Sequence, residues 1–173
     1  MTRLIFTKLE GCLKNFLFGS FCGSYSGFVA KACLFASLGA TTIMAASFTA
    51  LNLVGVIPSQ LLGRSYPVTA TEIVSTVLLA PLVETFLLII MLRFVKIFNK
   101  NTLETVVVTA LLFGVVHGLD GLLRFLPSTW LFFVFGARYL KWRAVSLTKA
   151  YFAAFAPHVF NNSLAFGTLM FGD

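Results

Sequence analysis

The feature that most constrains this chain is its long stretches without a charged residue. Residues 32–63 contain no Lys, Arg, Asp or Glu, and only 11% of the 173 residues are charged, whereas a soluble domain carries roughly 25%. An apolar run of about 20 residues spans a bilayer, where it must satisfy its own backbone, as a helix does. We therefore predict an all-α fold: a polytopic membrane helix bundle of about five transmembrane helices, preceded by an N-terminal interfacial amphipathic helix.

Five apolar segments are the predicted spans. They are residues 32–57, 73–92, 103–119, 128–140 and 150–171. The fourth is too short to cross straight, so it is expected to start inside the protein or to begin earlier, near Leu122. Residues 1–27 mix charges with apolar side chains at helical spacing, which predicts an interfacial segment. Residues 28–173 are expected to form one membrane helix-bundle domain.

The net charge of +7 is interpreted as a topology signal and not as a nucleic-acid surface. Eleven of the 13 basic residues lie before the first predicted span, between the second and third, or from the last residues of the fourth span to the start of the fifth; the other connections hold two. Because cytoplasmic loops are enriched in Lys and Arg, we predict a multi-pass integral membrane protein with its N-terminus in the cytoplasm and its C-terminus on the opposite side. These cations would also attract anionic membrane lipids.

Four polar residues inside the predicted spans form the candidate site. They are Glu84 in the second span, His117 in the third, and His158 and Asn162 in the fifth. His158 and Asn162 are four residues apart and lie on one helix face. At about 1.5 Å per residue, all four lie roughly 12–21 Å from the cytoplasmic ends, in one middle layer. Ionisable groups are costly in a bilayer, so a shared functional site is favoured over separate interhelical hydrogen bonds worth about 0.6 kcal/mol each.

Pro81 lies three residues before Glu84. Because proline has no amide hydrogen, it frees a backbone carbonyl in the preceding turn and is expected to kink or widen the helix there. Such an opening would admit water to the neighbourhood of the carboxylate.

Three short motifs follow one another along the chain, on the second, third and fifth predicted helices. They are Ala-Pro-x-x-Glu at 80–84, Phe-x-x-x-His at 113–117 and His-x-x-x-Asn at 158–162. In this order they resemble the CPBP family of intramembrane endopeptidases, also called the Abi or CAAX-protease family. The resemblance covers roughly residues 72–171. It implies a helical membrane fold with a glutamate-based, metal-free site that needs no cofactor.

The resemblance also implies a role for each site residue. Glu84 would be the general base that activates water, assisted by His117. His158 and Asn162 would form the oxyanion hole. The substrate would be a hydrophobic, lipidated or membrane-associated peptide or protein, cleaved near the cytoplasmic half of the bilayer.

The chain departs from the family's first motif, which is usually Glu-Glu-x-x-x-Arg. Thr85 stands at the position of the second Glu, and Ile89 at that of the Arg. Arg93 cannot easily substitute, because it lies about 180° around the helix from Glu84. The two missing groups are opposite in charge, so their joint loss leaves no orphan charge.

Other interpretations stay open. The altered first motif favours a non-catalytic relative, a membrane scaffold or binding subunit that holds a membrane protein partner or a lipid in the same cavity. On ligand type alone, Glu84, His117 and His158 would also suit a zinc ion. The chain contains no HExxH, GxSxG or Gly-rich phosphate-loop motif. A small transporter is the remaining alternative, although the chain shows no internal repeat of the kind transporters use.

Overall fold

The computed structural model describes residues 24–55, 69–99 and 101–171, and every regular element within them is helical. In chain order the elements are α2 (Tyr25–Leu53), α3 (Ala70–Val74), a π turn η2 (Ser75–Leu79), α4 (Ala80–Phe98), α5 (Thr102–Leu119), a 3-10 turn η3 (Leu122–Arg124), α6 (Phe125–Arg143) and α7 (Leu147–Phe171). The predicted all-α fold is confirmed for this part of the chain. The predicted interfacial helix falls almost entirely on residues 1–23, which lie outside the described residues.

Side-chain caps explain where two of the long helices begin. The Ser24 hydroxyl accepts the Gly27 amide hydrogen at 3.2 Å, so α2 begins at Tyr25, within the segment predicted to be interfacial. Asn101 caps α5 in the same way, through the Leu103 amide at 3.0 Å. Each cap satisfies an amide hydrogen that has no partner inside its helix.

A capping box starts the helical stretch that leads to the candidate site. The Thr69 hydroxyl accepts the Glu72 amide hydrogen at 3.2 Å, and the Glu72 carboxylate accepts the Thr69 amide hydrogen at 3.0 Å. From there the chain stays helical through the π turn over Ala70–Phe98. This stretch extends beyond the predicted span 73–92 at both ends.

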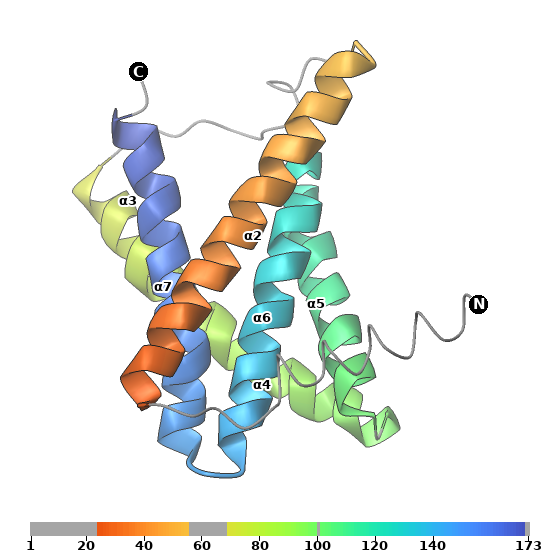
Figure 1. Cartoon of the computed structure of the whole chain (residues 1–173), viewed down its shortest axis with the longest axis vertical. Helices are drawn as coiled ribbons and strands as arrows, with labels where there is room; N and C mark the ends of the chain where they lie inside the picture. The colour runs from red at the N-terminus through yellow and green to blue at the C-terminus, as the bar shows by residue number, and fades with distance from the viewer. Residues whose placement is uncertain (1–23, 56–68, 100, 172–173) are drawn as a thin grey trace.

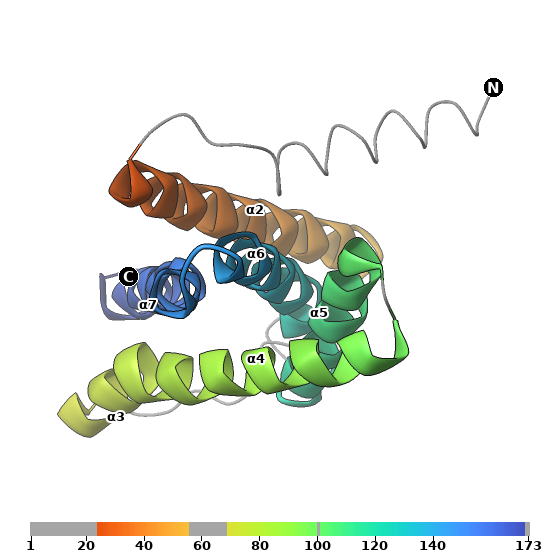
Figure 2. The same ribbon diagram turned by 90° about the horizontal axis from the view of Figure 1, so that it is seen from below.

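The long helices run alternately in opposite directions. Figure 1 shows the start of α2, the α4–α5 connection and the α6–α7 connection at one end of the molecule, and the end of α2, the α5–α6 connection and the end of α7 at the other. Seen from below, α2 lies on one side and the α3–α4 stretch on the other, with α6 and α7 between them (Figure 2). This is the arrangement that successive crossings of a bilayer require.

The central helix is α6, which packs against α2, α5 and α7. Its Phe132 and Phe135 side chains are fully buried. Gly114 permits α5 to approach closely, because a Cβ atom there would overlap Thr129 Oγ1 of α6. The predicted fourth span, 128–140, is part of this 19-residue helix, which begins earlier as its short predicted length suggested.

Large apolar side chains are exposed over much of the outer surface, and the mainly apolar interior also holds several polar side chains. Three helical stretches are long and apolar enough to cross a membrane: Tyr25–Leu53, Ala70–Phe98 and Thr102–Leu119. In the stretch Ala70–Phe98, only 17% of the most apolar window is buried inside the bundle, so most of its apolar side chains face outward. The polar side chains of Thr85 and His158, by contrast, are buried. An apolar exterior of this kind indicates a membrane protein. Within the described residues α6 and α7 are less apolar, so the count of about five spans stays a prediction.

Candidate active site

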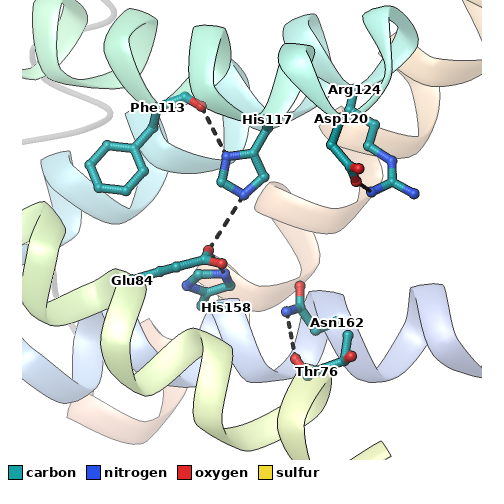
Figure 3. A network of polar contacts seen from close by, with 8 residues as sticks. All are labelled: Thr76, Glu84, Phe113, His117, Asp120, Arg124, His158 and Asn162. Carbon is teal, nitrogen blue, oxygen red and sulfur yellow. Dashed lines mark hydrogen bonds and ion pairs between the residues drawn. The ribbon is translucent and has the colours of Figure 1, made fainter. Parts of the chain in front are cut away.

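The structure brings three of the four predicted site residues together. Glu84 of α4 meets His117 of α5 and His158 of α7 (Figure 3). The Glu84 Oε2 atom lies 3.2 Å from His158 Nε2 and 3.5 Å from His117 Nε2. The side chains of Glu84 and His117 are partly buried, and that of His158 is only 5% exposed. We call these three residues the acid–imidazole cluster.

A helix carbonyl determines which nitrogen of His117 faces the carboxylate. His117 Nδ1 lies 2.9 Å from the Phe113 carbonyl oxygen, four residues earlier on α5. A carbonyl can only accept, so Nδ1 carries the hydrogen and donates it. His117 Nε2 is then attracted to Glu84 only if a second proton lies on the imidazole or on the carboxyl group, or if water lies between them. The contact is therefore suited to sharing and moving a proton.

The second imidazole is held by an aromatic wall from α6. The His158 ring stacks on Phe135, with ring centroids 4.8 Å apart, and meets Phe132 edge-on at 5.4 Å. Phe132 also packs against His117, with centroids 5.2 Å apart. The buried His158 Nδ1 has no hydrogen-bond partner within the described residues, so a neutral ring places its hydrogen on Nε2, which faces the Glu84 carboxylate and can donate to it. Packing on Phe132 and Phe135 thus orients both imidazoles.

The π turn η2 lies one turn before Glu84 and is explained by Pro81. In an α-helix the Ala80 amide hydrogen would bind the Thr76 carbonyl, but here it binds the Ser75 carbonyl, one residue earlier. The next amide, at Pro81, has no hydrogen to offer. The Thr76 carbonyl therefore loses both of its helical donors, and the helix is widened at the place where the proline predicted it.

Asn162 satisfies this freed carbonyl. Its Nδ2 atom donates to the Thr76 carbonyl oxygen at 2.9 Å, which ties α7 to the π turn (Figure 3). Asn162 thus reaches the same α4–α7 seam as His158, but its observed hydrogen bond holds backbone and does not reach Glu84. The sequence predicted a shared depth for these residues and missed this partner. The oxyanion-hole roles of His158 and Asn162 stay a prediction.

Thr85, which departs from the family motif, and Arg93, the cation that could not substitute for the missing one, lie in different surroundings. Thr85 is fully buried, and its hydroxyl has no hydrogen-bond partner within the described ranges. Arg93 is exposed and contributes to a groove that none of the cluster residues lines. In the described part of the chain, the acid–imidazole cluster therefore has no charged support from these positions.

Neighbouring charges and metal-binding groups add little to the cluster. Asp120 and Arg124, drawn beside it in Figure 3, form an exposed ion pair with each other. Among the residues that the structure describes, no group of three or more His, Cys, Asp or Glu side chains is arranged to hold a metal ion. The zinc interpretation thus gains no support from the described residues.

The Asn162–Thr76 hydrogen bond should matter only while Pro81 is present. Asn162→Ala is expected to lower the free energy of unfolding by about 1–2 kcal/mol, because it leaves the Thr76 carbonyl without a donor. In a Pro81→Ala background the same change should cost less than about 0.5 kcal/mol, because the backbone amide at position 81 then has a hydrogen that can bind the Thr76 carbonyl. Reversible unfolding in mixed micelles measures the cycle.

The control for this cycle is Ser163→Ala. Ser163 is the exposed neighbour of Asn162, and its hydroxyl bonds only within α7, to the Val159 carbonyl at 2.8 Å. Its removal should be nearly neutral in both backgrounds. Equal costs for Asn162→Ala with and without the proline would contradict this account of the π turn.

The fold and the cluster define a class of protein: its described part is helical, with membrane-type apolar helices and a glutamate–histidine site between helices. The chain matches no protein-family model, no curated protein and no solved structure. The resemblance of its three motifs to the CPBP family therefore remains an expectation drawn from the sequence.

Proposed function

We propose that this protein is a glutamate-dependent intramembrane endopeptidase, of the kind that its motifs resemble. One observation carries the proposal: a single carboxylate oxygen of Glu84 lies 3.2 and 3.5 Å from two imidazole nitrogens on two other helices. A carboxylate beside two imidazoles can exchange protons with them, so a proton that Glu84 takes from water can be passed on. No cofactor is required by this chemistry.

The proposed reaction is hydrolysis of a peptide bond. Glu84, assisted by His117, takes a proton from water, and the water oxygen attacks the carbonyl carbon of the substrate. His158 turns its Nε2 hydrogen from Glu84 to the developing oxyanion, and Asn162 supplies its second amide hydrogen. The carbon–nitrogen bond then breaks as the proton passes from Glu84 to the leaving nitrogen.

We further propose five membrane crossings with a cytoplasmic N-terminus. Seven of the eight Lys and Arg residues in the described part lie toward the end that carries the start of α2, which supports this orientation. At about 1.5 Å per residue, the 19 residues of α6 are about 28 Å long, close to a hydrocarbon core of roughly 30 Å. Because α6 packs against α2, α5 and α7, much of its surface contacts other helices and not lipid, so it can cross a bilayer without being as apolar as the outer helices.

The experiment that tests the activity compares new peptide termini in membranes with and without the protein. Cells expressing the parent chain should yield new N-termini within or beside hydrophobic segments of membrane-associated proteins. Hydrolysis in ¹⁸O-labelled water by the protein in phospholipid nanodiscs should place the label at each new C-terminus, and chelators should not slow it. Identical termini in both samples would reject the proposal.

A second candidate function is a non-catalytic membrane scaffold or binding subunit. Two contacts favour it, because each has a purely structural explanation. Glu84 is held by two imidazoles, and the observed Asn162 hydrogen bond goes to a backbone carbonyl. A membrane complex that copurifies with the protein and tolerates Glu84→Gln would support this alternative.

A further inference from the structure

A groove of about 470 Å³ opens between α4, the end of α6 and the start of α7. Its α4 wall includes Phe86, Ile90 and Arg93, which lie roughly on the opposite side of that helix from Glu84 at about 100° per residue. None of the acid–imidazole cluster lines it. The groove is therefore a separate feature from the candidate active site.

The chemistry of the groove is that of an amphiphile site. Phe86 and Ile90 of α4 and Phe152 of α7 give it exposed apolar walls. Arg93 and Thr148 add a cation and a hydroxyl to its lining. Pockets of about 300–1,000 Å³ with apolar walls and few polar groups hold small ligands. A ligand that matches this lining has a hydrocarbon chain and one anionic group.

The position of the groove identifies the source of such a ligand. Arg93 lies toward the end of α4, and Thr148 lies at the start of α7, both at the end of the molecule where the basic residues gather. From Phe86 to Arg93 is about 10 Å along α4, a length that takes part of an acyl chain. A phospholipid of the surrounding bilayer would meet this groove from the side, with its phosphate at the level of the basic residues.

We propose that this groove binds one anionic glycerophospholipid, with an acyl chain along Phe86, Ile90 and Phe152 and its phosphate at Arg93. Arginine suits this role because its planar guanidinium group donates two parallel hydrogen bonds to a phosphate. The site does not depend on the proposed peptidase activity, and either can fail without the other.

Native mass spectrometry tests the proposal on the full chain, released from nanodiscs made of equal amounts of phosphatidylglycerol and phosphatidylcholine. The parent should retain phosphatidylglycerol over phosphatidylcholine by about fivefold or more, as one Arg–lipid contact allows. Arg93→Gln should lose this preference. Lys96→Gln, which removes a cation from the same helix outside the groove, should keep it.

Two further measurements separate a lipid from a general charge effect. Ile90→Trp, which fills the groove and leaves Arg93 in place, should lower the total amount of retained lipid. An equal loss of preference in Arg93→Gln and Lys96→Gln would overturn the proposal, as would unchanged retention in Ile90→Trp. Displacement of the lipid by inorganic phosphate alone would show a free-anion site and would also overturn it.

Discussion

Glu84→Gln is expected to slow peptide-bond hydrolysis by about 10²–10⁴-fold, the usual contribution of a general base. The change removes the ability to take a proton from water but keeps the size of the side chain. Its amide oxygen still accepts the hydrogen bond from His158 Nε2, so the helices should stay packed. The rate of ¹⁸O incorporation at the new C-terminus, measured in nanodiscs, reports the effect.

The matched control for that substitution is Glu72→Gln. Glu72 lies in the capping box before the π turn, where glutamine serves as well as glutamate. The control therefore makes the same chemical change on the same helical stretch, away from the cluster, and should leave the rate unchanged. Parent-like hydrolysis by a folded Glu84→Gln protein would remove the proposed mechanism.

Gly114→Val is expected to destabilise the bundle by about 3 kcal/mol, at the upper end for overpacking a closed contact. A Cβ atom at Gly114 would overlap Thr129 Oγ1 and would lie 3.1 Å from the Phe125 carbonyl oxygen. Thr129 cannot simply turn away without loss, because its hydroxyl donates to that carbonyl at 2.8 Å. The expected result is that α5 moves away from α6, which also carries His117 away from Glu84.

Reversible unfolding in mixed micelles measures this effect, with Gly167→Val as the control. Gly167 is also a helix glycine, but a Cβ atom there meets nothing within 4 Å. Its replacement should change the free energy of unfolding far less. Adding Thr129→Ala to Gly114→Val should recover part of the lost stability. If both valine variants are equally unstable, helix propensity and not the α5–α6 contact explains the loss.

The polar site was predictable because each of its members is conspicuous in an apolar segment. Glu84, His117 and His158 were selected by the cost of ionisable groups in a bilayer, and their shared depth predicted that they would meet. The 3.2 and 3.5 Å contacts agree with that expectation. Their catalytic roles stay a prediction, because proximity alone does not establish a reaction.

The contacts that hold the site residues in place could not be predicted in the same way. Phe132 and Phe135 are two of many phenylalanines in the chain, and nothing in their spacing distinguishes those that face the imidazoles. The pairing of Asn162 with the Thr76 carbonyl depends on which donors the π turn leaves unused. That choice depends on how α7 packs against α4, at a separation of 86 residues.

The sequence by itself determined that the chain is helical and of membrane type, because charge-free runs of this length can satisfy their backbone only within themselves. It also determined which polar groups those helices carry and, through Pro81, where one helix widens. Only the tertiary structure decided which of these groups touch, which of the two carboxylate oxygens is shared and where Asn162 donates. The physical reason is range: periodicity, caps and proline act within a few residues, whereas the contacts of the site join helices that are far apart along the chain.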